Sequence, residues 1–172
     1  MTVAPTITTP RLRLRGHTMA DIPPLCALFA SERAEYMGGA ISAKESYRWI
    51  AAEVGSWVLH GFGSWGVERR DDAAFMGQIG INQAHEFPEP ELGWVLLDAF
   101  EGHGYAAEGA QAALDWWWRA PDHHTLVSYI HPNNARSIAL ATRLGAQHDP
   151  DAPLPQGEDS RETVVYRHQR PL

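Results

Sequence analysis

Polar and apolar residues alternate in the segment Arg-Leu-Arg-Leu-Arg at 11–15, and this period of two predicts a half-buried strand. Two longer runs, 62–69 and 75–82, flank the polar turn 70–72 and predict a β-hairpin. Three later segments have a similar strand character: 91–97, 125–131 and 162–168. The pattern therefore predicts a sheet built from strands spread over the whole chain.

Apolar residues at helical spacing predict four helices between these strands. Asp21 is expected to cap the first helix, and Ser42 and Glu45 match a capping box at the start of the second. The third helix is expected at 108–119. The fourth follows the Pro-Asn-Asn segment at 132–134 and ends where Gly145 provides a C-cap.

The resulting order is one strand, two helices, three strands, and then alternating helix and strand. A run of strands followed by β-α-β alternation is typical of an α+β (α/β mixed) protein with helices on the faces of a mixed sheet. A chain of 172 residues without repeats or linkers is expected to form one domain, 1–172. A chain of this size buries roughly 70% of its unfolded surface, enough for a core without disulfides or metals.

Composition and charge exclude several classes of function. The chain has 14 basic and 21 acidic residues, a net charge of −7, which argues against binding to a nucleic-acid backbone. It has no apolar run near the ~20 residues that span a bilayer and no pattern of a signal peptide at its start, so no membrane partner is expected. A single cysteine, Cys26, fits a reducing compartment. The expected location is cytoplasmic.

The strand expected at 91–97 leads into a glycine-containing turn at 102–107 that opens the next helix. Glycine allows the backbone to approach a ligand closely, and the first N–H groups of a helix have no partner within it. Together with the helix dipole, these groups favour an anion such as a pyrophosphate. The turn formally matches the dinucleotide pattern G-x-G-x-x-A. However, the next strand does not end in the acidic residue which that pattern requires, so a dinucleotide oxidoreductase stays a distant alternative.

The same segment resembles motif A of the GNAT family of N-acetyltransferases, Q/R-x-x-G-x-G/A, here Glu101-x-x-Gly104-x-Ala106. A second block that resembles the family follows at 134–146, Asn-Ala-Arg-Ser-Ile-Ala-Leu-Ala-Thr-Arg-Leu-Gly-Ala. The form Gly-His-Gly-Tyr-Ala-Ala-Glu-Gly looks most like the branch that contains ribosomal-protein N-terminal acetyltransferases. The resemblance extends over nearly the whole chain.

The resemblance implies a single-domain fold with a mostly antiparallel sheet that is splayed open after its fourth strand, and acetyl-CoA as the acyl donor. The pantetheine arm would pair with the strand backbone, and the pyrophosphate would lie on the amides of the turn. Asn134 would steady the pantetheine region, and Arg143 would reach the phosphates. The cofactor-binding residues it implies are Val95, Leu96, Leu97, Gly102, His103, Gly104, Tyr105, Ala106, Ala107, Asn134 and Arg143. The histidines lack metal-ligand spacing, so no metal site is expected.

Three residues are candidates for proton transfer. Many relatives have a tyrosine where this chain has Ala141, so Ser137 becomes the candidate acid, with an ordinary first-turn serine as the alternative. Glu91, at the start of the fourth expected strand, is a candidate base or else a solvated strand-end carboxylate. His131, at the end of the fifth, titrates in a useful range. Glu101 stands where the family usually has arginine or glutamine.

The implied reaction is direct attack of a primary amine on acetyl-CoA in a ternary complex, by a monomer or homodimer. The amine belongs to a protein N-terminus (a peptide acceptor) or to a small molecule, and the net charge of −7 favours a cationic one. Candidate pocket aromatics are Tyr36, Trp65 and Trp94. Because the usual tyrosine is absent, the alternative is a non-catalytic module that binds acyl-CoA, such as a sensor.

Overall fold

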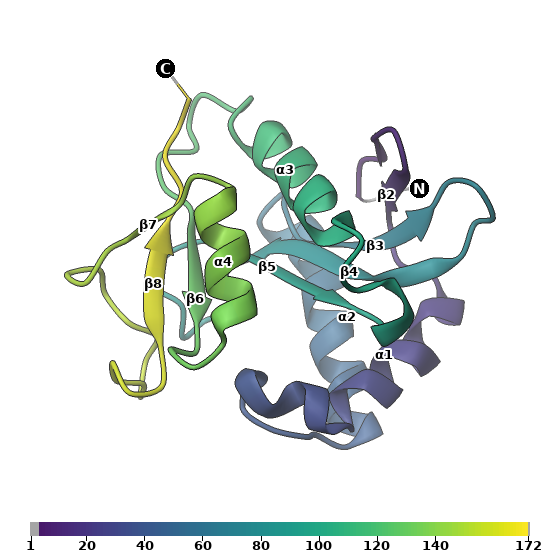
Figure 1. Cartoon of the computed structure of the whole chain (residues 1–172), viewed down its shortest axis with the longest axis horizontal. Helices are drawn as coiled ribbons and strands as arrows, with labels where there is room; N and C mark the ends of the chain where they lie inside the picture. The colour runs from purple at the N-terminus through teal and green to yellow at the C-terminus, as the bar shows by residue number, and fades with distance from the viewer. Residues whose placement is uncertain (1–3, 172) are drawn as a thin grey trace.

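The computed structural model describes residues 4–171, and its strands form one sheet in the order β1-β2-β3-β4-β5-β6-β8-β7 (Figure 1). All neighbouring strands are antiparallel except β5 and β6, which are parallel. The strands are β1 (Ile7–Thr8), β2 (Leu12–Arg15), β3 (Ser64–Arg69), β4 (Phe75–Asn82), β5 (Glu91–Leu96), β6 (Val127–Ile130), β7 (Gln147–His148) and β8 (Val164–Arg167). The two-residue strands β1 and β7 are too short to produce a hydrophobic pattern, and the sequence did not predict them.

Helices cover both faces of the sheet, as expected (Figure 1). Helices α1 and α2 pack together on one face, α3 crosses the other face, and α4 lies against β6 and β8. The α-helices are α1 (Ile22–Phe29), α2 (Ala43–Leu59), α3 (Tyr105–Trp117) and α4 (Ala135–Arg143). Short 3-10 helices are η1 (Met19–Asp21), η2 (Glu32–Met37) and η3 (Asp98–Phe100). The mixed α+β architecture is therefore confirmed.

The sheet opens between β5 and β6. Strands β4 and β5 stay in register along their full common length, from Gly77 opposite Leu96 to Asn82 opposite Glu91. In contrast, β5 and β6 share a single registered pair, Glu91 with Val127. Among the described residues, the remaining edge of β5 therefore has no neighbouring strand, which confirms the splay after the fourth predicted strand.

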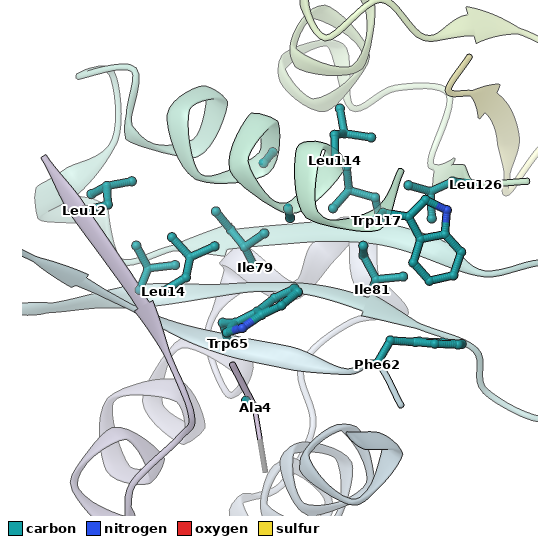
Figure 2. Close-up of a cluster of buried hydrophobic side chains, with 14 of the residues drawn as sticks. Ala4, Leu12, Leu14, Phe62, Trp65, Ile79, Ile81, Leu114, Trp117 and Leu126 are labelled. Atoms are coloured by element: carbon teal, nitrogen blue, oxygen red, sulfur yellow. The ribbon is translucent and has the colours of Figure 1, made fainter. Parts of the chain in front are cut away.

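The main core lies between the sheet and α3 (Figure 2). Gly109 of α3 sits directly above the strands, and a methyl group there would overlap Ile79 Cδ1 and contact Leu12 Cδ1 at 3.4 Å. Trp65 belongs to this core and is fully buried, and its indole N–H donates to the Pro5 carbonyl at 2.8 Å. The prediction that Trp65 lines a pocket is therefore wrong, because its side chain points to the α3 face of β3.

Local capping was predicted correctly at one helix and incorrectly at another. Ser42 Oγ accepts the Glu45 N–H at 3.3 Å, and the Glu45 carboxylate accepts the Ser42 N–H at 2.9 Å, which confirms the capping box. Asp21, however, makes no side-chain cap on α1. Its buried carboxylate accepts from the Arg15 guanidinium at 2.7 Å and from the Thr18 N–H at 2.8 Å. The strong charged donor of Arg15 outcompetes the helix N-terminus.

In the part of the chain that the structure describes, no helix combines the length and the apolar composition needed to cross a membrane.

Candidate active site

A cavity of about 970 Å³ opens where β5 and β6 separate. Its walls come from β4, β5 and β6, from α2 and η2 on one face, and from the start of α3 and α4 on the other. One end of β5, at Leu96, leads to the turn before α3, and the other end begins at Glu91. Six strand residues span roughly 20 Å, so the cavity can hold an extended ligand together with a second, smaller one.

The turn before α3 has the backbone geometry of an anion site. Gly102 and Gly104 have φ angles of 76° and 78°, in the left-handed region that favours glycine. Gly104 is the N-cap of α3, and no side chain of residues 4–171 caps this helix. The first N–H groups of α3, which begins at Tyr105, are thus free of side-chain acceptors at the positive end of the helix dipole. Tyr105, Ala106 and Ala107 line the cavity at this point.

Two carboxylates near this turn are compensated by cations. Glu108 accepts from the Thr9 hydroxyl at 2.6 Å and from the Arg11 backbone N–H at 2.9 Å, and it pairs with the Arg11 guanidinium. Glu101 pairs with Arg33 and with Arg136, the latter at 2.6 Å. These arginines hold the pKa of Glu101 below its usual value, hydrogen bonding from Arg33 contributing most. The unusual glutamate of the motif thus brings no uncompensated charge to the turn.

The open edge of β5 presents its backbone to the cavity. The Leu97 N–H donates to the Met76 carbonyl at 2.8 Å, so alternation along the strand directs the backbone groups of Leu96 away from β4. The Leu96 carbonyl accepts from the Arg33 guanidinium at 3.0 Å rather than from a strand. The Leu96 N–H on this edge is therefore available to a ligand.

Most of the cofactor-binding candidates meet at this cavity. Those that line it are Val95, Leu96, Gly102, Gly104, Tyr105, Ala106, Ala107, Asn134 and Arg143. Two candidates lie outside the lining. Leu97 packs with the cluster of α1 and α2, and His103 is exposed with its carbonyl bound to the Arg11 guanidinium at 2.9 Å.

Asn134 and Ser137 lie at the start of α4. Asn134 Oδ1 accepts the Ser137 N–H at 3.2 Å, so Asn134 caps this helix as well as lining the cavity. Ser137 also lines the cavity, and its hydroxyl has no hydrogen bond to the described residues. Its side chain is consequently free to contact a ligand. The site expected for the usual tyrosine is occupied by Ala141, which is buried among Ile130 and Ala146.

Glu91 and His131, the other two catalytic candidates, line the same cavity. Burial of the Glu91 carboxyl raises its pKa to about 8, and the charge of Glu53 contributes to the increase. His131 packs its ring against Tyr36 with 5.1 Å between the ring centroids. Its Nδ1 accepts the Asn133 N–H at 3.1 Å, so in the neutral ring Nε2 carries the proton and Nδ1 is the basic nitrogen.

Sequence reasoning missed Glu53, a buried carboxylate on α2. It accepts from Ser64 Oγ at 3.0 Å, from Gln78 Nε2, and from Asn82 Nδ2 at 3.3 Å. Burial raises the pKa of Glu53 to about 7, against the opposing hydrogen bonds from Ser64 and Gln78. Its position in the helix could have indicated this burial. Glu53 lies three residues after Ile50 and four before Trp57, so it shares the buried face of α2 with both.

Aromatic side chains form part of the cavity wall. The predicted Tyr36 and Trp94 line it, together with Trp49 of α2 and Phe87, which packs on Tyr129 at 5.1 Å between ring centroids. Within residues 4–171, no group of three or more His, Cys, Asp or Glu side chains has the arrangement of a metal site.

Comparison with known proteins assigns the family. Residues 11–147 match the model of an acetyltransferase (GNAT) domain. A solved acetyltransferase from Agrobacterium tumefaciens str. C58 is 38% identical with a TM-score of 0.90, over 96% of this chain and 95% of that one.

Two further solved structures belong to ribosomal-protein acetyltransferases. A candidate ribosomal-protein-serine acetyltransferase from Vibrio cholerae is 26% identical with a TM-score of 0.74, over 98% of this chain and 99% of that one. A ribosomal alpha-N-protein acetyltransferase, RimL, solved in complex with coenzyme A, shares the fold with a TM-score of 0.72 at 18% identity, over 95% of this chain and 97% of that one. On the family model and on this structural likeness, the chain belongs to the GNAT acetyltransferase family.

Proposed function

We propose that this protein transfers the acetyl group of acetyl-CoA to a primary amine by direct attack within a ternary complex. The observation that carries the proposal is the single cavity that joins the uncapped turn at Gly104, the open edge of β5 at Leu96, and the carboxylate of Glu91. An anion site, a strand edge and a proton acceptor are the three features that this reaction requires.

The residues of the turn and of β5 suit a CoA thioester. The free N–H groups at the start of α3 would bind the pyrophosphate, and the exposed Arg143 at the end of α4 would add a cation beside it. The open edge at Leu96 would pair with the amide-containing pantetheine arm. A backbone N–H on this edge would also stabilise negative charge that develops on the thioester oxygen.

Glu91 and Ser137 would share the proton transfers. A pKa of about 8 places the Glu91 carboxyl within range of a general base that works near neutral pH. Ser137, whose hydroxyl faces the cavity, would donate to the departing thiolate. His131 is the competing base, and its Nδ1 would accept the proton after releasing the Asn133 N–H. The proposed acceptor is a primary amine, on a protein N-terminus or on a small molecule.

Release of free thiol from acetyl-CoA, measured with a panel of amines, tests the proposal. We expect amine-dependent thiol release that is reduced in Glu91→Gln, with mass spectrometry detecting the acetylated amine. CoA binding in a thermal-shift assay without thiol release from any amine would instead favour the non-catalytic acyl-CoA module. If neither acetyl-CoA nor CoA changes the melting temperature, the proposed function is wrong.

A further inference from the structure

Two carboxylates face each other across a pair of glycines in the cavity. Gly80 on β4 and Gly93 on β5 are register partners, so their Cα atoms lie roughly 5 Å apart. A methyl group at Gly93 would lie 3.9 Å from the Glu91 carboxyl carbon, which places that carboxyl above β5. A methyl group at Gly80 would overlap Ser64 Oγ, which donates to Glu53. The absence of side chains at both glycines therefore brings Glu91 and Glu53 into one chamber.

The polar groups around Glu53 leave two acceptors unused. Gln78 is buried with 6% of its surface exposed, and its Nε2 donates to Glu53 while its Oε1 has no partner in the described part of the chain. Asn82 donates to Glu53 through Nδ2, and its Oδ1 is likewise without a partner among residues 4–171. A buried acceptor without a hydrogen bond lowers the free energy of unfolding, so a ligand that donates to these two oxygens would stabilise the protein. Two amide oxygens beside a carboxylate match the three N–H donors of an ammonium group.

The charge of the cavity favours the same ligand. The Glu101 carboxylate is already paired with Arg33 and Arg136. Six other glutamates line the cavity, and within the described residues none of them forms an ion pair: Glu32, Glu35, Glu53, Glu91, Glu158 and Glu162. Arg143, at the end of α4, is the only lining arginine without an ion pair among these residues. Above pH 8, where Glu53 and Glu91 are ionised as well, such a field attracts cations and opposes an acceptor that carries a carboxylate or phosphate.

Aromatic side chains in the cavity wall suit an organic cation rather than a metal ion. Trp49 lies one helical turn before Glu53 on α2, lines the cavity and is 38% exposed. Phe87 and Tyr129 form an aromatic pair in another part of the lining. Aromatic faces bind ammonium groups through cation–π attraction and also pack against the methylene chain between two amines.

We propose that Glu53, Gln78 and Asn82 bind a second ammonium group of the acceptor, so that the preferred substrate is a diamine or polyamine-like cation with its reacting amine beside Glu91. This inference rests on the proposed acetyl transfer. Glu53 would act in recognition, while Glu91 would act on the amine that becomes acetylated. The second ammonium supplies the donors that Gln78 Oε1 and Asn82 Oδ1 lack.

A comparison of diamines with monoamines of equal chain length tests the inference. The substrates are α,ω-diaminoalkanes of increasing length and the matching n-alkylamines, and the readout is kcat and KM from thiol release. We expect the best diamine to exceed its monoamine in kcat/KM by about tenfold or more, since a charged hydrogen bond contributes that much. In Glu53→Gln this advantage should be lost through a higher KM for the diamine relative to the monoamine. Both amines are measured in the same variant at the same pH, because Glu53 also raises the pKa of Glu91 and its removal affects both substrates equally.

A matched control separates local recognition from net charge. Asp71→Asn removes the same charge from the exposed hairpin turn and should leave the diamine advantage unchanged. Gln78→Leu removes the unpaired oxygen while keeping the carboxylate, and it should also weaken the diamine preference. Equal kcat/KM for diamine and monoamine in the wild type would overturn the inference, as would an equal loss for both substrates in Glu53→Gln.

If the protein does not acetylate amines, the ammonium site can still be tested by binding. If no amine releases thiol, calorimetric titration of the diamine into the protein still measures the recognition site directly. Binding that Glu53→Gln weakens by about tenfold would support the ammonium site without catalysis. Absence of diamine binding, or binding that Glu53→Gln leaves unchanged, would overturn it.

Discussion

At the scale of single residues, the raised pKa of Glu91 predicts the pH dependence of the reaction. A pKa of about 8 means that the carboxyl is protonated below that pH and becomes a base above it. We therefore expect kcat/KM to rise with pH and to level off above about 8. The acceptor amine titrates too, so the measurement requires an amine with a pKa well below that of Glu91.

The Glu91→Gln variant tests whether the rise of kcat/KM with pH is due to Glu91. Removal of a general base lowers the rate by about 10²–10⁴-fold. The variant should show that loss above pH 8 and should no longer show the rise between pH 6 and 8. If the variant keeps the wild-type pH profile, the general base is His131 and not Glu91.

Glu53 makes a separate prediction for stability. Its pKa is about 7 in the folded protein and near 4.5 in an unfolded chain, so the folded state holds the proton more tightly. The contribution of Glu53 to the free energy of unfolding is fully present below about pH 4.5 and is lost as the pH rises through 7. The difference in this free energy is about 3 kcal/mol. Glu53→Gln should therefore gain stability relative to the wild type between pH 5 and 8. Urea unfolding at the two pH values measures this, and a constant difference would contradict it.

The same two residues show what a sequence can and cannot predict about a site. Glu91 was a candidate because it opens a strand beside the splay, a position that follows from the order of elements. Glu53 lies 38 residues earlier in the chain, and it enters the cavity only because α2 packs against β3 and β4. Contacts between distant segments of this kind depend on tertiary packing, which the local pattern does not contain.

At the scale of elements, the turn before α3 depends on the left-handed conformation of Gly104. Alanine at this position would meet only the Arg11 guanidinium, 3.6 Å away, so sterics with neighbours are minor. The left-handed φ of 78° nevertheless costs an alanine about 1–2 kcal/mol. We expect Gly104→Ala to weaken CoA binding by about tenfold, because relief of this strain would turn the N–H groups away from the phosphates.

Gly157 provides the matched control for this turn. It has a φ of 92° and open space around its Cα, and it does not line the cavity. Gly157→Ala should therefore lower stability by a similar amount while leaving the CoA affinity unchanged. Isothermal titration of CoA and urea unfolding separate the two effects, and equal CoA affinities for both variants would contradict the assignment of the turn.

Elements with their own local signals were predicted well. The hairpin of β3 and β4, the capping box at Ser42 and the glycine turn before α3 each follow from neighbouring residues. The errors involve side chains that pack or pair with other elements. Asp21 pairs with Arg15 instead of capping α1, and Trp65 packs under α3 instead of lining the cavity. In both cases the partner lies on another element, and the alternation of the strand alone does not say which face meets the ligand.

At the scale of the whole molecule, the net charge of −7 and the acidic cavity act on the acceptor together. Long-range attraction between exposed charges is screened by salt, with a Debye length of about 10 Å at 0.1 M and about 3 Å at 1 M. A cationic diamine should therefore show a kcat/KM that falls steadily as the salt concentration rises.

An amine that is uncharged at the assay pH supplies the reference for this effect. Its kcat/KM should change little with salt, because it gains nothing from the field of the protein. The salt dependence of the diamine should also be shallower in Glu53→Gln than in the wild type, since one of the attracting charges is gone. At pH 8 or above, where Glu53 is ionised, Asp71→Asn carries the same net charge as that variant but leaves the cavity intact. A slope reduced equally by both substitutions would mean that the overall charge attracts the acceptor. A larger reduction in Glu53→Gln would instead locate the attraction in the chamber that holds Glu53 and Glu91.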